Sequence, residues 1–141
     1  MNRLFEILLH SRRTDRVIDK RTHAALDYLV TGYFFCLAGM FWGRHRRAAF
    51  TALTNAMAVM GTSMFTDYPG SLRRSIPFET HGKVDVIQAA MAMGMPALLG
   101  FSTSPAAVPF HLQAGNELLV VSATDWESRD EVGEEQLRTA V

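Results

Sequence analysis

The stretch TDYPGSLRRSIPFETHGKVD, residues 66–85, is the long polar interval between the two apolar halves of this 141-residue chain. Short polar motifs of the first half recur in the second at one constant spacing: Thr22-His23 with Asp27 as Thr80-His81 with Asp85, and Thr66-Asp67-Tyr68 as Thr124-Asp125-Trp126. The spacing is 58 positions in each case (23 to 81, 66 to 124). The sequence therefore predicts a tandem duplication, with residues 66–85 as the junction between its two copies.

Charged residues are unevenly spread, although the formal net charge is zero. Residues 28–43, 48–66 and 86–116 contain no Asp, Glu, Lys or Arg. A helix on the surface of a soluble protein carries a charged stripe, and these segments carry none. About 20 residues of helix reach roughly 30 Å, the thickness of a bilayer core. We therefore expect membrane-spanning helices; the alternative is a soluble four-helix bundle.

Turn signals divide the apolar sequence into four expected helices, at about 24–43, 48–66, 82–101 and 108–124. Pro96 is expected to kink the third of them. The predicted fold is an all-α integral membrane four-helix bundle built from two tandem transmembrane hairpins. The hairpins span residues 22–68 and 80–126, and a loop over residues 69–79 joins them.

Both ends of the chain are polar. Residues 1–21 predict either a basic arm or a short helix lying at a membrane surface, and residues 127–141 predict an acidic tail. Two hairpins place both termini and the central loop on one side of the membrane. Because that side carries all but three of the 14 Lys and Arg residues, the positive-inside rule predicts cytoplasmic termini. Tyr68 and Trp126 are expected at the interface on that side, as part of an aromatic belt.

This topology brings six ionisable residues to one end of the bundle: His23, Asp27, Asp67, His81, Asp85 and Asp125. His23 and Asp27 are four positions apart and share a helical face, as do His81 and Asp85. We expect a structural polar cluster that ties the helix ends together. The alternative is a functional site in which the two histidines serve a proton relay, a metal ion, or a haem or chlorin. The pattern does not distinguish these, so the sequence assigns no metal ligand, no catalytic residue and no particular cofactor.

Glu117 lies well inside the fourth expected helix, seven residues from Thr124. An ionisable group at such depth in a membrane is costly and usually faces the bundle interior. Its counterpart in the first half is Val59, so the repeat is broken here. One interpretation groups Glu117 with His23 and His81 as cofactor-binding residues. The other is a protonated carboxyl group hydrogen-bonded between helices.

The run Met95-Pro96-Ala97-Leu98-Leu99-Gly100-Phe101 carries a proline followed closely by Leu-Gly-Phe. In this it resembles small bacterial membrane proteins of the SPW-repeat type, which are built from tandem two-helix units. The serine and tryptophan of that motif are absent here. The resemblance implies a multi-pass protein of the bacterial inner membrane with the predicted fold, and it implies no activity.

The chain has no phosphate-binding glycine loop, no Cys-x-x-Cys, no serine nucleophile elbow and no zinc-protease motif. Our first hypothesis is therefore a non-catalytic accessory or scaffold subunit. Its partners would be the lipid bilayer and either a larger membrane complex or another copy of the chain. The arginines beside the apolar segments fit anionic lipid and not nucleic acid. The second hypothesis is a cofactor-binding or proton-handling membrane protein that uses the His/Asp cluster and Glu117.

Overall fold

The structure is a computed structural model that describes residues 17–127. Within this range the chain forms four α-helices, α2 (Lys20–Phe41), α3 (Arg46–Phe65), α4 (Phe78–Leu98) and α5 (Val108–Ala123), and a 3-10 turn, η1 (Pro105–Ala107). The predicted all-α class and four-helix count are confirmed for these residues. Residues 1–16 and 128–141, which hold most of the expected arm and tail, lie outside the described range.

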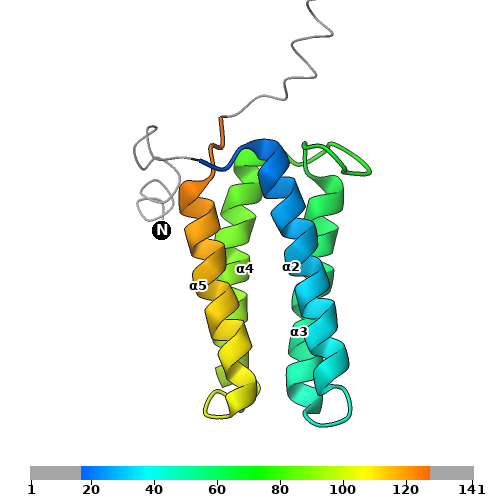
Figure 1. Cartoon of the computed structure of the whole chain (residues 1–141), viewed down its shortest axis with the longest axis vertical. Coiled ribbons are helices and arrows are strands. Elements are labelled where there is room, and N and C mark those ends of the chain that lie inside the picture. Colours follow the sequence, from blue (N-terminus) through cyan, green and yellow to red (C-terminus); the bar gives the residue numbers. More distant parts are fainter. Residues whose placement is uncertain (1–16, 128–141) are drawn as a thin grey trace, which may run out of the picture.

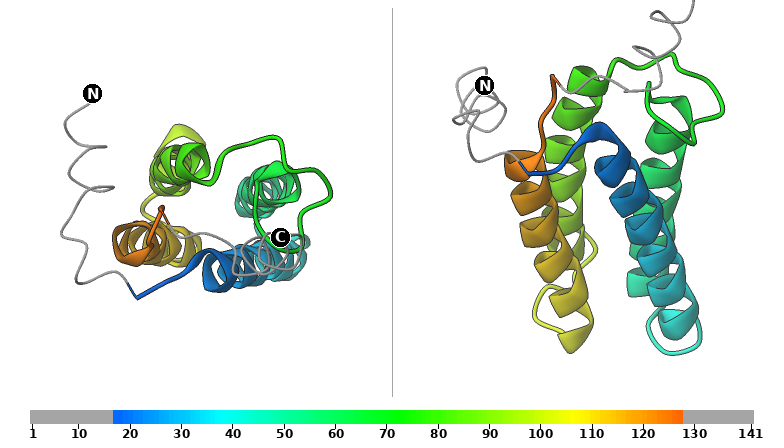
Figure 2. Two further views of the ribbon diagram at one scale, coloured as in Figure 1. Left: turned by 90° about the horizontal axis from the view of Figure 1, so that it is seen from above. Right: turned by 45° about the horizontal axis from the view of Figure 1, so that its top comes forward.

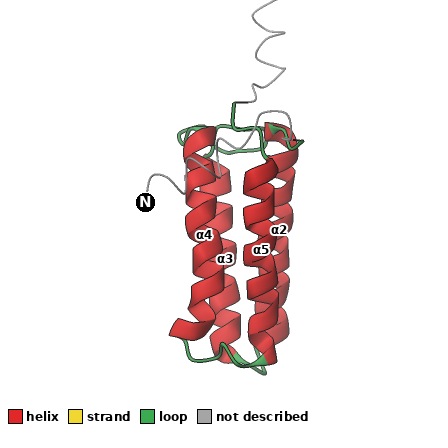
Figure 3. Cartoon of the chain, turned by 90° about the vertical axis from the view of Figure 1, so that its left-hand side faces the viewer, coloured by secondary structure: helices red, strands yellow, loops and turns green. Residues whose placement is uncertain are grey.

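The four helices stand lengthwise as two hairpins, α2 with α3 and α4 with α5 (Figure 1). The central loop and both ends of the described chain lie at one end of the bundle, which we call the junction end. The turns that close the two hairpins lie at the other end (Figure 3). Within the described residues, consecutive helices therefore pair as two hairpins, and the central loop lies at the same end as both ends of the described chain.

Two helices begin earlier than the sequence predicted. α2 begins at Lys20 because Asp19 caps it: the Asp19 carboxylate accepts a hydrogen bond from the backbone N–H of Thr22 at 2.7 Å. α4 begins at Phe78, directly after Pro77. Pro96 lies in the last turn of α4, which ends two residues later, and Gly100 follows in a left-handed conformation with φ +69°. Pro96 thus lies close to the end of a helix rather than well inside one.

The interior has an apolar part and an aromatic part. The apolar part holds Phe34, Phe110 and a column of alanines at the contact of the four helices. The aromatic part lies at the junction end and contains Tyr68 and Trp126, which are only 0% and 5% exposed. The prediction that these two residues form part of an aromatic belt at the membrane interface is therefore wrong. They pack inward because the segments after α3 and α5 fold across the ends of neighbouring helices.

Those two segments make matching backbone contacts. The N–H of Asp67 donates to the carbonyl of Ile76 at 2.8 Å, and the N–H of Asp125 donates to the carbonyl of Ile18 at 2.8 Å. The residue pairs are related by the spacing of 58 found in the sequence (18 to 76, 67 to 125). The end of each half is thus pinned to the beginning of the other half.

The bundle buries polar side chains and exposes apolar ones. Its buried polar and charged residues include His23, Asp27, Thr31, Asn55, His81, Asp85, Gln88 and Gln113. Its exposed large apolar residues include Leu29, Met40, Phe50, Ile87, Leu98, Leu112 and Leu119. Among the described residues, α2 is the one helix that is both long and apolar enough to cross a membrane by those two measures.

Candidate metal centre

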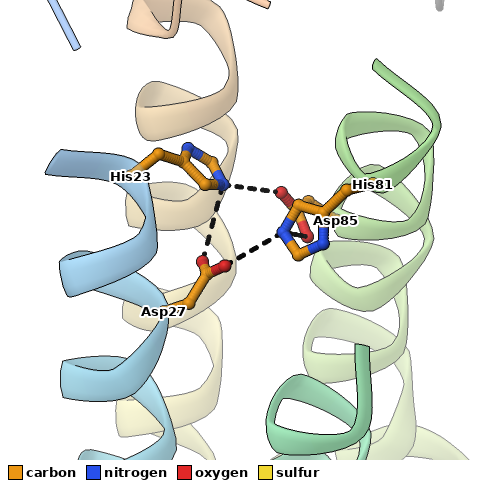
Figure 4. Close-up of side chains that lie close together, drawn as sticks. All are labelled: His23, Asp27, His81 and Asp85. Carbon is orange, nitrogen blue, oxygen red and sulfur yellow. Dashed lines mark hydrogen bonds and ion pairs between the residues drawn. The ribbon is translucent and has the colours of Figure 1, made fainter. Parts of the chain in front are cut away.

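Four side chains meet at the centre of the junction end: His23 and Asp27 from α2, and His81 and Asp85 from α4 (Figure 4). We call them the His/Asp cluster. The Nε2 atom of His23 lies 3.1 Å from an Asp85 oxygen and 3.5 Å from an Asp27 oxygen. The Nε2 atom of His81 lies 3.0 Å from an Asp27 oxygen and 3.1 Å from an Asp85 oxygen. One potential ligand atom from each residue lies within 4.8 Å of all the others.

The helices dictate this meeting. Within each pair the histidine precedes the aspartate by four positions, so both point from the same face of one helix. α2 and α4 stand diagonally across the bundle (Figure 2), and each contributes one histidine and one aspartate. Both histidines are 1% exposed, so the cluster is sealed from solvent on their side.

Two threonines fix which nitrogen each histidine presents. The Oγ1 atom of Thr66 lies 2.7 Å from Nδ1 of His81, and that of Thr124 lies 2.9 Å from Nδ1 of His23. Each threonine already donates its single hydroxyl proton, at 2.7 Å, to the carbonyl four residues earlier. It must therefore accept from the histidine, so Nδ1 carries the proton and Nε2 faces the cluster. Metal-binding histidines are held in this way, with one ring nitrogen anchored and the other presented.

An aromatic lid covers the cluster at the junction end. The Trp126 ring lies 4.8 Å from both the His23 ring and the Phe78 ring, measured between centroids. The Tyr68 ring lies 5.5 Å from the His81 ring. These rings exclude water from the imidazoles and fix their orientation. In such a dry site, charged groups interact more strongly than they would in water.

The two carboxylates of the cluster differ in their other partners. Asp27 accepts a hydrogen bond from the Tyr68 hydroxyl at 2.7 Å and a long one from Ser63 at 3.4 Å. Burial raises the pKa of Tyr68 well above its ordinary value, and the neighbouring Asp27 raises it further. Tyr68 therefore remains a donor at physiological pH. Asp85 contacts the two imidazoles. The residue that corresponds to Tyr68 in the second half of the chain is Trp126, which has no hydroxyl group to donate to Asp85.

The donor set of the cluster is one that binds Zn²⁺ in proteins. Zn²⁺ binds imidazole nitrogen and carboxylate oxygen at about 2.0–2.2 Å, which puts neighbouring ligand atoms of a tetrahedron about 3.3 Å apart. In the cluster the nitrogen–oxygen distances run from 3.0 to 3.5 Å, with each histidine facing a different oxygen of each carboxylate, and one ligand atom from each of the four residues lies within 4.8 Å of the others. Two carboxylates and two neutral imidazoles around a divalent ion also form a neutral unit, which lowers the cost of burial.

The surroundings of Nε2 of His81 also favour a bound metal ion. It is buried and has two carboxylate oxygens at 3.0 and 3.1 Å, yet neither lies in line for a hydrogen bond. A buried polar atom without a hydrogen-bond partner calls for an explanation such as a bound ion. A metal ion between the two carboxylates would use this nitrogen lone pair as a ligand.

The other two aspartates of the predicted cluster lie apart from its centre. Asp67 lies 3.4 Å from Lys20 and 3.4 Å from Arg74 and is partly exposed. Asp125 accepts a hydrogen bond from the backbone N–H of Glu127 at 3.2 Å. The cationic groups beside Asp67 are thus those of Lys20 and Arg74. The six-residue ring predicted from the sequence is thus a core of four residues and two peripheral carboxylates.

Glu117 lies in the wall of a cleft between α2 and α5 whose inner end is formed by His23, Asp27 and Asp85. Among residues 17–127 no side chain donates a hydrogen bond to its carboxyl group. The side-chain amide of Asn55 donates to the carbonyl of Thr51. Glu117 therefore faces the same cavity as the cluster but is not part of it.

The sequence pattern alone indicates no role for Thr66 and Thr124. The signal was present, because both threonines recur at the same spacing as the histidines. Their role became visible only when the structure placed each hydroxyl group beside Nδ1 of a histidine from the other half.

No protein-family model, no curated protein and no solved structure matches this chain.

Proposed function

We propose that the protein is a small integral protein of the bacterial inner membrane whose His/Asp cluster binds one divalent transition-metal ion. The ion would hold two tandem hairpins together. The donor set of two imidazoles and two carboxylates favours Zn²⁺ over the oxygen-preferring ions Mg²⁺ and Ca²⁺. The observation that carries the proposal is the convergence of four buried ligand atoms within 4.8 Å.

The membrane location is supported by the distribution of polar and apolar side chains. The uncharged segments 28–43, 48–66 and 86–116 cover most of the helical length, and large apolar side chains point outward from them. A soluble bundle would place charges on that surface. In a bilayer the same surface contacts lipid, and the buried polar groups find partners inside the bundle.

The tandem duplication is supported by interactions that repeat at the sequence spacing. His23 meets Thr124 as His81 meets Thr66, and each histidine also contacts the aspartate of the other half. Since neither half holds more than two of the four ligands, the ion site requires both.

A single ion agrees with this geometry better than a haem or chlorin does. A porphyrin held by two axial histidines needs flat open space between their Nε2 atoms. Here the imidazole rings are 5.4 Å apart at 85° to each other, and both carboxylates of the cluster lie between them (Figure 4).

Metal analysis of the protein purified from membranes in mild detergent tests the metal site. We expect one transition-metal ion per chain, and we expect Co²⁺ exchanged into the protein to show the visible absorption of a tetrahedral complex. The His81→Gln and Asp85→Asn variants should lose both signals. A metal-free wild-type protein that shows no Co²⁺ spectrum on titration would refute the metal proposal.

Cysteine labelling tests the membrane location. Cys36 is exposed on α2 and would face lipid. In inverted inner-membrane vesicles we expect a membrane-impermeant maleimide to leave Cys36 unlabelled. It should label Leu72→Cys in the central loop and miss Gly43→Cys at the opposite end, both in a Cys36→Ala background. Labelling of Cys36 and of both engineered cysteines would contradict a membrane-spanning bundle.

An accessory or scaffold role is the second candidate function, and outward-facing glycines favour it. A methyl group added at Gly32 or Gly39 of α2, or at Gly61 of α3, would meet nothing within 4 Å. These positions therefore leave open surface that a helix of another protein can approach closely. Native mass spectrometry tests this role: a partner or second copy supports it, and a lone chain counts against it.

A further inference from the structure

We infer that the cleft between α2 and α5 binds a single-chain amphiphile with a hydroxyl head group, which enters sideways from the bilayer. The inference rests on the proposed membrane location and does not require the metal ion. It assigns a role to Gln113 and Glu117, which the His/Asp cluster does not use.

The cleft is a cavity of about 250 Å³ that opens between the two hairpins. Leu26, Leu29 and Val30 of α2 line one wall, and Val120 of α5 lines the other. α3 and α4 pack against each other on the far side of the bundle, whereas α2 and α5 have little contact with each other (Figure 1). The bundle is thus open on one side, and the opening leads to the cluster.

Two residues that line the cleft, Gln113 and Glu117, carry polar groups without partners among residues 17–127. The amide nitrogen of Gln113 is buried without a hydrogen-bond acceptor, and the residue is 8% exposed. The carboxyl group of Glu117 has no donor among residues 17–127. A buried donor left without an acceptor is unfavourable, so a ligand that supplies the acceptor gains affinity. A hydroxyl group is the simplest head group that answers both, because its oxygen accepts from Gln113 and its proton is donated to Glu117.

The size and rim of the cleft indicate a single alkyl chain. Ligand pockets for drug-sized molecules measure about 300–1,000 Å³, so this cavity holds a head group and a few carbons. The rest of the ligand would lie outside the bundle. Leu29 lines the cavity and is 68% exposed, so an alkyl chain leaving the cleft passes along it into the surrounding lipid.

Trp126 offers a fluorescent reporter, since its ring lies 4.8 Å from that of His23 at the inner end of the cleft. The chain has two tryptophans, so Trp42→Phe leaves Trp126 as the sole emitter. The probe is dodecanol carrying a nitroxide on its chain, added to the protein in lipid nanodiscs. We expect saturable quenching by the alcohol. Its methyl ether, which cannot donate a hydrogen bond, should bind about five- to tenfold more weakly.

Variants separate specific binding from partition into lipid. Gln113→Leu and Glu117→Leu should each weaken binding of the alcohol about five- to tenfold. Gln88→Leu is the matched control, because Gln88 is a buried glutamine on α4 that does not line the cleft. Val120→Phe fills the cavity without removing a polar group, so it should abolish saturable quenching while the melting temperature is retained.

Quenching that rises linearly in all variants, or equal binding of the alcohol and its methyl ether, would overturn the inference. These outcomes are independent of the metal proposal. A metal-free protein that binds the alcohol saturably supports the cleft and overturns only the metal site. A metal-loaded protein with unsaturable quenching overturns only the cleft.

Discussion

Replacing Thr66 with valine tests whether the histidines are held in place for a metal ion. Valine keeps the shape of threonine but removes the oxygen that accepts from Nδ1–H of His81, at 2.7 Å. Thr66 is completely buried, so no water replaces the lost acceptor. The imidazole then either keeps an unsatisfied N–H or turns its proton toward the cluster, where the metal ion would bind.

The expected magnitude follows from that single contact. An unsatisfied buried donor costs about 1–3 kcal/mol, which corresponds to about a 5- to 150-fold change in an equilibrium constant. Loss of a hydrogen-bond partner behind a metal ligand typically weakens metal binding by about 10–100-fold. We therefore expect Thr66→Val to bind Zn²⁺ about 10–100-fold more weakly than the wild type does.

The assay is competition for Zn²⁺ between the detergent-solubilised protein and a chromophoric chelator. Thr62→Val is the matched control: Thr62 lies one turn earlier on α3, and its hydroxyl donates only to backbone carbonyls of its own helix. Thr62→Val should leave the affinity for Zn²⁺ unchanged. If Thr66→Val bound Zn²⁺ as tightly as the wild type, or if both variants weakened binding equally, the proposed orienting role of Thr66 would be refuted.

Three further predictions concern stability, measured as the free energy of unfolding in detergent. Gly82→Ala should destabilise the protein by about 1–3 kcal/mol, because the added methyl group would lie 2.9 Å from the Trp126 ring; Gly94→Ala on the same helix, with nothing within 4 Å, should not destabilise it. Tyr68→Phe should lessen the loss of stability above about pH 10. The pKa of Tyr68 is raised in the folded state, so in this pH range only the unfolded chain releases the proton. Identical dependence of the unfolding free energy on alkaline pH in the wild type and the variant would contradict this. Asp19→Ala should cost about 1 kcal/mol through loss of the α2 N-cap. Because the pKa of Asp19 is lowered in the folded state, this contribution should be present near pH 7 and fade as the pH falls below about 4. A stability difference between wild type and variant that stays the same at acid pH would contradict this.

The positions of the helices were predicted well because the uncharged segments and the turn residues between them mark where each helix lies. Segments without charges, ended by Pro-Gly and basic turns, leave few choices for the backbone, and α3 and α5 agree with the expected ranges to within two residues. The beginnings of α2 and α4 were placed too late because charged residues were counted as loop. An N-cap such as Asp19 allows a helix to begin within a polar stretch.

The site was predicted only in part, since spacing shows which residues share a face and does not show how far each one reaches. The pairs His23–Asp27 and His81–Asp85 were grouped correctly because i,i+4 geometry is local. Asp67 and Asp125 lie outside the central four because both follow the last helical residue, where Asp67 pairs with Lys20 and Arg74. The hydrogen bonds of the threonines and the opening between α2 and α5 depend on the packing of distant segments, which no local pattern contains.

The two halves of the chain are similar where the proposed ion needs them to be similar and different where the cleft needs them to differ. Tetrahedral coordination by two copies of one helical motif requires equivalent ligands, and the ligand pairs and their threonines are identical in the two halves. A ligand-binding cleft on one side of the bundle requires instead that the two halves differ at that side. The position occupied by Val59 in the first half holds Glu117 in the second, and both line the same cleft. Duplication of a hairpin would thus supply a symmetric centre at once, and a single substitution beside it would give that centre one polar, accessible face.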